Sequence, residues 1–201
     1  MQGDRTDKAA EVFREHGGLL RTAEALRSGV HPRTLYAMRD SGLLERVSRG
    51  VYRLAGGPPL SNPDLVTAAT RIPKGVVCLI SALSFHGLTI QIPHEVHVAL
   101  SSGAEEPRLD YPPIRVYRFG DGSFTEGVET HDIDGVTVRI YGPEKTLADC
   151  FKFRNRIGLD TAVEALRAYR ERGRIRVDEL MGYAEICRVG NVMRPYLEAI
   201  L

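Results

Sequence analysis

The chain has 201 residues, of which 43% are hydrophobic and 26% are charged, a composition typical of a folded globular protein. This length suits one large domain or two small ones. No apolar run approaches the roughly 20 residues that a membrane-spanning helix needs, and residues 1–5 lack the basic-then-apolar pattern of a secretion signal. Three widely separated cysteines indicate reduced thiols rather than a disulfide framework. We therefore expect a cytoplasmic protein.

The formal net charge of +1 hides a local excess of arginine. Residues 1–57 contain 10 Lys/Arg against 7 Asp/Glu, and six arginines lie between Arg27 and Arg53, opposed only by Asp40 and Glu45. Such a cluster inside a near-neutral chain indicates a polyanionic partner more specifically than a high overall isoelectric point would. A basic face that is merely solvated is the alternative.

The first 43 residues have the pattern of three short helices. Apolar residues at helical spacing predict a helix over Asp7–His16, which Gly17-Gly18 ends. A second helix is expected over Thr22–Arg27, with Thr22 as its cap and Ala23 and Leu26 facing inward. The third begins at His31-Pro32 and runs to about Ser41, since proline at the first helical position loses no needed donor. Leu35 and Met38 are expected to hold this helix to the core.

A hairpin and a linker follow the third helix. Two short strands, Leu44–Val47 and Val51–Leu54, flank Ser48-Arg49-Gly50, where the glycine supplies a positive φ. The segment Gly56-Gly57-Pro58-Pro59 is typical of a linker. We therefore expect one domain over residues 1–57 and a second over residues 58–201.

The second domain is predicted to be α+β, with its strands first and its helices last. Asp134-Gly135 is typical of the turn of a hairpin. The expected strands are Val76–Ile80, Glu95–Leu100, Ile114–Phe119, Val128–Ile133 and Val136–Tyr141. The expected helices are Asn62–Arg71, Ser81–His86, Glu144–Phe153, Leu159–Glu171, Val177–Ile186 and Val192–Leu201.

Three helices followed by a two-stranded wing form the layout of a winged helix-turn-helix. In such domains the third helix enters the major groove and its first residues meet base edges, while cations on the wing meet phosphates or the minor groove. Because Leu35 and Met38 face inward, Arg33, Tyr36 and Asp40 must face outward together. The candidate DNA-contacting residues are Arg27, Arg33, Thr34, Tyr36, Arg39, Arg46, Ser48, Arg49 and Arg53.

Other functions remain open on this pattern. Winged helices also serve as protein-docking modules, and a small helical domain can carry arginines only for solubility. A regulator that senses a small molecule through its second domain would need a pocket there. The oligomeric state is also open, and monomers that bind DNA cooperatively are one arrangement.

Several segments resemble the AbiEi-type antitoxins of type IV toxin–antitoxin systems, which are linked to abortive phage infection. No single motif is diagnostic, but their order and spacing along nearly the whole chain are fairly specific. In the N-terminal domain they are Gly17–Thr22, the Arg33–Tyr36 helix and the Leu44–Tyr52 wing. Farther along they are Ile80–Leu88, Pro93–Leu100 and Pro143–Phe151.

The resemblance implies an autorepressor that binds inverted repeats in DNA upstream of its own operon. It also implies that the C-terminal domain counteracts a nucleotidyltransferase-like toxin without requiring a stable complex with it. Carried over by position, the DNA-binding surface includes Arg33, Arg39, Arg46, Arg49 and Arg53. His31-Pro32 departs from the small polar cap that is frequent in the family, so the fine sequence preference is left open.

Other chemical motifs have simpler explanations, so we expect no enzyme, metal or cofactor. His94 and His97 are spaced i, i+3 in a strand-like run, where they would point to opposite faces. Gly142–Thr146 lacks the second glycine of a phosphate loop and is typical of a capped helix start. Ser84 and His86 lack a nucleophile elbow, and Asp132 and Asp134 flank a turn. The arginines at 167, 170, 172, 174 and 176 suit a helix C-terminus, and a second DNA surface or an antitoxin contact patch is the alternative.

Overall fold

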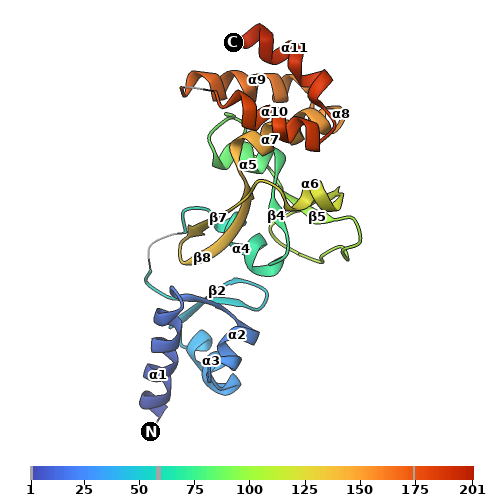
Figure 1. Ribbon diagram of the computed structural model, residues 1–201. Coiled ribbons are helices and arrows are strands. Elements are labelled where there is room, and N and C mark those ends of the chain that lie inside the picture. Colours follow the sequence, from blue (N-terminus) through green and yellow to red (C-terminus); the bar gives the residue numbers. More distant parts are fainter. Residues whose placement is uncertain (1, 58–59, 174) are drawn as a thin grey trace. The chain divides into compact units, whose positions relative to one another are not determined.

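The computed structural model describes residues 2–57, 60–173 and 175–201 (Figure 1). The chain folds into two compact units. The first extends to Pro73 and also includes His131–Val138, and the second comprises Lys74–Thr130 and Arg139–Leu201. Each unit has a hydrophobic core of its own.

The first unit is a winged helix-turn-helix with one helix added. Its helices are α1 (Gln2–Glu15), α2 (Thr22–Arg27), α3 (Pro32–Asp40) and α4 (Pro63–Arg71). Its strands β1 (Leu19–Arg21), β2 (Leu44–Ser48) and β3 (Val51–Leu54) form an antiparallel sheet in the order β1-β3-β2. The predicted helices and the two wing strands are confirmed, and β1 is an addition that the sequence did not reveal.

The core of the winged helix is small and apolar. Phe13 from α1 and Leu35 from α3 are fully buried, and Met38, Leu44 and Tyr52 are at most 5% exposed. These side chains come from α1, α3 and both wing strands, so helix and wing are held to one another by the same cluster. The predicted inward face of the third helix is confirmed.

The predicted details of the second helix are wrong. Thr22 is the first helical residue, and Arg21 occupies the cap, where its backbone N–H donates to the Glu24 carboxylate at 3.0 Å. Leu26 is 38% exposed, and Ala25 is the buried residue. The helix begins directly after β1, which shifts the inward face by one residue.

A mixed five-stranded sheet has the strand order β6-β5-β4-β8-β7, and all of it belongs to the second unit except the hairpin end His131–Val138, which belongs to the first. The strands are β4 (Val76–Val77), β5 (Val96–Ser101), β6 (Ile114–Phe119), β7 (Val128–Ile133) and β8 (Val136–Tyr141). β5 runs antiparallel to β4 and parallel to β6, with His97 opposite Arg115 and Ala99 opposite Tyr117. The predicted turn at Asp134-Gly135 is confirmed, with φ of 54° and 79°.

One predicted strand is shorter than expected and ends in a helix. Only Val76 and Val77 of the Val76–Ile80 run pair in the sheet, and α5 (Leu79–Phe85) begins within the run. A short buried helix and a buried strand are both continuous apolar runs, so hydrophobic pattern alone does not separate them. Leu79 turns the chain with a positive φ of 47°.

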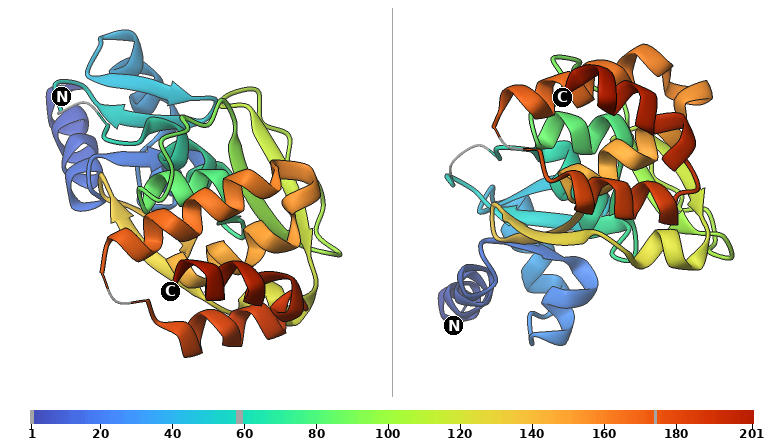
Figure 2. Two further views of the ribbon diagram at one scale, coloured as in Figure 1. Left: turned by 90° about the horizontal axis from the view of Figure 1, so that it is seen from above. Right: turned by 45° about the horizontal axis from the view of Figure 1, so that its top comes forward.

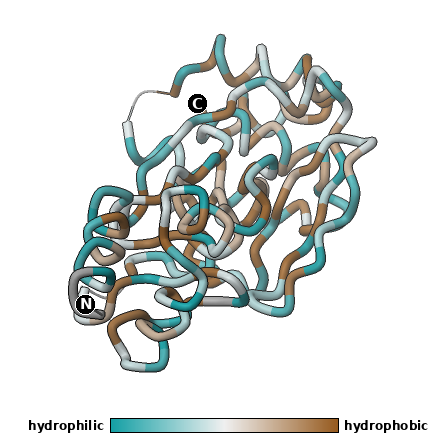
Figure 3. Tube along the Cα trace, turned by 90° about the horizontal axis from the view of Figure 1, so that it is seen from below, coloured by the Kyte–Doolittle hydropathy of each residue, from teal (hydrophilic) through white to brown (hydrophobic). Residues whose placement is uncertain are grey.

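Helices of the second unit gather on one side of this sheet (Figure 2). They are α7 (Pro143–Lys152), α8 (Arg154–Ile157), α9 (Leu159–Glu171), α10 (Val177–Ile186) and α11 (Gly190–Ile200), while α6 (Asp121–Thr125) follows β6. Hydrophobic and hydrophilic stretches alternate along the chain, as expected for elements that each bury one face (Figure 3). The predicted helix start at Gly142-Pro143 is confirmed.

The central helix α7 buries charged residues that an amphipathic pattern would place outside. Lys145 and Asp149 are both 0% exposed, and Lys145 Nζ donates to Asp149 Oδ2 at 2.5 Å. Glu144 is 2% exposed and pairs with Arg176 at 2.6 Å. The cysteines Cys78, Cys150 and Cys187 are free and buried around this helix. A polar network thus lies inside the core of the second unit.

Candidate nucleic-acid interface

The geometry of helix α3 is set at its first turn. His31 caps the helix, and its Nδ1 accepts a hydrogen bond from the Arg33 backbone N–H at 3.2 Å. Pro32 occupies the first helical position, where its missing N–H costs nothing. The His31 imidazole therefore caps the helix in place of the small polar residue that is frequent in the family. Its hydrogen bond fixes the first turn of α3.

The outward face of α3 presents the residues predicted for base contact. Arg33, Tyr36 and Asp40 are exposed, and Thr34 is half-buried. Arg39 pairs with Asp40 at 2.6 Å, which raises the pKa of Arg39, and its guanidinium lies 5.1 Å from the centre of the Tyr36 ring. Arg39 is therefore held along the helix surface by its neighbours, whereas Arg33 projects without an ion-pair partner among the described residues.

The wing places its arginines on one hairpin. Arg46 and Arg49 are exposed, and the turn passes through Gly50 with φ of 75°, a conformation that favours glycine. The pairing of β2 with β3 shifts between Arg46 and Ser48, and the Ser48 side chain lies outside the described residues. The hairpin presents Arg49 at its tip.

Arg53, in the second wing strand, has a carboxylate partner. It lies opposite Glu45 across the β2–β3 ladder, and its Nη2 is 2.6 Å from Glu45 Oε2. Arg27, at the end of α2, is exposed and its Nε donates to the Ala23 carbonyl at 3.3 Å. Among the described residues, no carboxylate pairs with Arg27, Arg33 or Arg49, and these three carry the uncompensated charge.

Two further arginines, which the sequence analysis missed, brace the wing from within the first unit. Arg71 at the end of α4 donates from Nη1 to the Arg49 carbonyl at 2.5 Å. Arg21 in β1 donates from Nη2 to the Arg71 carbonyl at 3.2 Å. Arg71 lies beyond the predicted linker, and no local pattern connects it to the hairpin. The hydrogen bond from Arg71 fixes the backbone of the wing turn at Arg49, while the Arg49 side chain faces solvent.

The other sequence motifs have structural roles. His94 and His97, predicted to face opposite ways, line the same pocket of the second unit because His94 precedes β5 and is not part of it. Asp132 accepts the Gly135 N–H at 3.1 Å, within the turn. His86 Nε2 lies 2.8 Å from the Tyr141 carbonyl oxygen. Among the described residues no group of three His, Cys, Asp or Glu could hold a metal ion.

The arginines near the end of α9 do more than complement a helix dipole. Arg172 donates to the carbonyls of His86 and Gly87, and Arg176 pairs with Glu144 and Glu179. Arg170 donates to the Leu201 carbonyl at 3.3 Å, while Arg167 is exposed. Arg174 lies outside the described residues. Most of these arginines therefore connect elements of the second unit.

None of the described helices is long and apolar enough to cross a membrane. No curated protein matches the chain. The fold is similar to a solved structure, described as the crystal structure of the RV2827C protein from Mycobacterium tuberculosis, with 13% identity and a TM-score of 0.55 over 94% of this chain and 79% of that one. The likeness concerns the fold alone.

The match that bears on function lies in the winged helix. Residues 7–55 match the family model described as "Transcriptional regulator, AbiEi antitoxin". The matched segment runs from α1 to the end of the wing and contains every candidate DNA-contacting residue. This family consists of regulators and is not a known enzyme family. The winged helix of this chain, over residues 7–55, is therefore similar to the AbiEi antitoxin family of transcriptional regulators.

Proposed function

We propose that this protein is a cytoplasmic repressor of its own operon that binds inverted repeats in operator DNA through its winged helix. The observation that carries the proposal is the set of three uncompensated arginines, Arg27, Arg33 and Arg49, on α2, α3 and the wing of one folded unit. A polyanion neutralises such charges, whereas an apolar partner would leave them unpaired.

Helix α3 has the features that entry into a major groove requires. The groove is about 12 Å wide and admits one helix, whose N-terminal residues reach base edges. Arg33 lies in the first turn of α3 and can contact guanine O6 and N7 with two hydrogen bonds. The wing arginine Arg49 is suited to phosphate or the minor groove. We propose residues 1–57 as the DNA-binding domain.

We further propose that residues 58–201 form the antitoxin domain, which counteracts a nucleotidyltransferase-like toxin and has no catalytic activity of its own. The family assignment of residues 7–55 supports an antitoxin. A genetic test is direct: the neighbouring gene is expected to encode a nucleotidyltransferase-like protein, and co-expression of the full chain carrying Arg33→Ala and Arg49→Ala is expected to relieve its toxicity as well as the unmodified chain does. Relief that is lost with these two substitutions would contradict this division of labour.

Arg33→Ala and Arg49→Ala are expected to weaken DNA binding in different ways. Loss of Arg33 should cost about 1–3 kcal/mol on operator DNA and much less on random DNA, because it removes a base contact. Loss of Arg49 should weaken binding to both about equally, because phosphate carries no sequence information. Fluorescence anisotropy with the chain's own upstream DNA and a scrambled duplex measures both effects.

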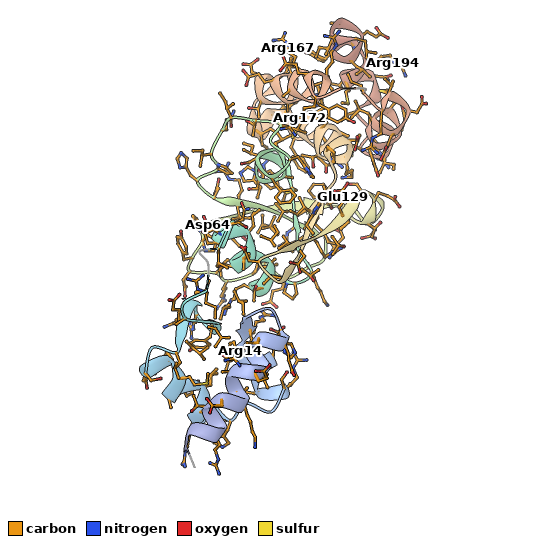
Figure 4. All side chains as sticks on the ribbon, turned by 90° about the vertical axis from the view of Figure 1, so that its left-hand side faces the viewer. Arg14, Asp64, Glu129, Arg167, Arg172 and Arg194 are labelled. Atoms are coloured by element: carbon orange, nitrogen blue, oxygen red, sulfur yellow. The ribbon has the colours of Figure 1, made fainter. Side chains whose placement is uncertain are left out.

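The control for these variants is Arg14→Ala. Arg14 is an exposed arginine of the same unit that pairs with Glu11 at 2.5 Å and is not among the candidate contacts (Figure 4). Its loss is expected to leave the affinity for DNA nearly unchanged. Equal losses for Arg33→Ala on operator and random DNA would rule out base contact by Arg33. Absence of any preference for upstream DNA in the unmodified chain would favour a protein-docking winged helix.

Glu45→Gln is expected to strengthen DNA binding. Glu45 neutralises Arg53 across the wing, and the amide removes that charge while keeping the size of the side chain. We expect a gain of about twofold to fivefold on both operator and random DNA, in the range of one exposed ion pair, with little change in stability. Electrophoretic mobility shifts at one fixed salt concentration measure it. An unchanged affinity would mean that Arg53 does not approach the DNA.

A further inference from the structure

The second unit has a pocket of about 220 Å³ beside the start of β5, the volume of about seven water molecules in the liquid. The segment 91–95 forms one side of it, and β5, β6, α5 and α8 contribute the remaining walls. Its polar lining consists of Gln91, His94, Glu95, His97, Arg115 and Arg156. The size suits a compound somewhat smaller than most drug-like ligands.

His97 is the buried polar group of this pocket. It is 4% exposed, and burial together with the charges of Arg115 and Arg156 lowers its pKa to about 4, so the imidazole is neutral at pH 7. Its Nδ1 has no hydrogen-bond partner among the described residues. A neutral imidazole carries one N–H, on either Nδ1 or Nε2. If the proton is on Nε2, the buried Nδ1 carries a lone pair without a partner and not an N–H without an acceptor. Nε2 lies 3.9 Å from Oε1 of Glu95, whose carboxylate also lines the pocket. The Nε2–H of His97 is therefore a donor on the edge of the ring nearest Glu95.

The charges around the pocket favour an anion. Arg115 Nε lies 2.6 Å from Glu95 Oε1, so these two charges compensate each other. Arg156 lies over the Tyr117 ring, 4.4 Å from its centre, and no described carboxylate pairs with it. The pocket therefore holds one uncompensated positive charge and a neutral N–H donor. A metal cation would meet both arginines and is disfavoured.

The remaining walls are apolar. Ile80 and Ile157 line the pocket half-buried, and Ile92 lines it while 84% exposed. Ile90, two residues before Ile92, is fully exposed. A ligand whose hydrophobic part covers these exposed isoleucines gains binding free energy, since each CH₂ group removed from water contributes to affinity. Inorganic phosphate has no such part.

We propose that this pocket binds a small organic anion, a carboxylate on an apolar body of about the size of benzoate. The carboxylate meets the guanidinium of Arg156 and the Nε2–H of His97, and the apolar body lies against Ile92 and Ile157. Charge-assisted hydrogen bonds from arginine to a carboxylate are among the stronger polar contacts in proteins. This inference does not depend on whether the winged helix binds DNA.

Benzoate is the probe for the test, titrated into the full chain labelled with ¹⁵N at histidine. We expect a saturable shift of the His97 ring resonances with a Kd of about 1 mM or tighter. Benzamide, the neutral analogue, and benzylammonium, the cationic one, are expected to bind at least about tenfold more weakly. Benzoate that fails to saturate at tens of millimolar, or benzamide that binds equally well, overturns the proposal. Binding of phosphate without binding of benzoate overturns the claim that the ligand has an apolar body.

Variants locate the binding. Arg156→Gln is expected to weaken benzoate at least about tenfold, and Ile92→Glu, at an exposed position that folding tolerates, is expected to weaken it as well. The matched control is Arg167→Gln, an exposed arginine on α9 outside the pocket (Figure 4), which is expected to leave the affinity unchanged. Equal affinities of Arg156→Gln and Arg167→Gln for benzoate overturn the assignment of the site.

Discussion

Asp149→Ala is expected to lower the free energy of unfolding of the second unit by about 3–5 kcal/mol. Asp149 and Lys145 are both fully buried, and the carboxylate accepts hydrogen bonds from Lys145 Nζ at 2.5 Å and from Cys187 Sγ at 3.1 Å. Burial raises the pKa of Asp149, whereas Lys145 opposes that change. Removing the carboxylate leaves an ammonium group in the core without a counter-charge.

The rings around Lys145 replace only part of what Asp149 supplies. Lys145 Nζ lies 4.2 Å from the centre of the Tyr141 ring and 5.0 Å from that of Phe119. Such cation–π contacts contribute about 2 kcal/mol when desolvated, less than the penalty of burying an isolated charge. The aromatic pair therefore moderates the loss but does not abolish it.

The cysteines make this measurement specific to the second unit. All three cysteines of the chain are free and buried there, so urea-dependent thiol labelling reports the unfolding of that unit alone. The control is the double variant Lys145→Met, Asp149→Leu, which replaces both charges with apolar side chains of similar volume. It is expected to recover most of the lost stability, since paired replacement of a buried ion pair is near neutral. A double variant as unstable as Asp149→Ala would indicate a packing role instead of a charge role.

The winged helix could be predicted in most respects because its signals are local. Pro32 marks a helix start, Gly50 a hairpin turn, and Leu35 with Met38 the inward face of a single helix. Each of these depends on residues within one or two turns of chain. The same reasoning anticipated the turn at Asp134-Gly135 in the second part of the chain.

Features that depend on distant partners could not be predicted. Strand β1 has three residues and exists because Leu19–Arg21 pair with β3, between 30 and 34 positions away. Arg71 supports the wing through the Arg49 carbonyl, a contact that no spacing encodes. The pocket at His97 forms because β6 places Arg115 beside it in the sheet. Register between distant strands is a tertiary property, and local pattern does not specify it.

The charged residues of α7 show a different limit. A capped helix is predicted over Glu144–Phe153, and charged residues on an amphipathic helix ordinarily mark its solvated face. Glu144, Lys145 and Asp149 are instead buried with partners: Arg176 for Glu144, Asp149 for Lys145 on the same helix, and Cys187 as a further donor to Asp149. Buried charge is tolerated only with such partners, and Arg176 and Cys187 lie 32 and 38 residues along the chain.

Raising salt from about 50 to 200 mM is expected to weaken operator binding about 150-fold if two copies of the chain occupy an inverted repeat. Each copy contributes two of the uncompensated arginines to phosphate, Arg27 and Arg49, while Arg33 is assigned to a base. Neutralising about four phosphates releases condensed counterions, and log K falls with log salt at a slope of about −3.6. A single copy should show a slope of about −1.8 and a loss of only about 12-fold over the same range.

Anisotropy titrations of operator and half-site duplexes at several salt concentrations measure these slopes. The half-site is expected to show the smaller slope, and Arg49→Ala should reduce either slope by about 0.9 for each copy bound. Glu45→Gln should change the slope in the opposite sense, because it removes a negative charge from the wing. A slope near zero on operator DNA would contradict binding through the arginines of α2, α3 and the wing, because no apolar or neutral contact reproduces counterion release.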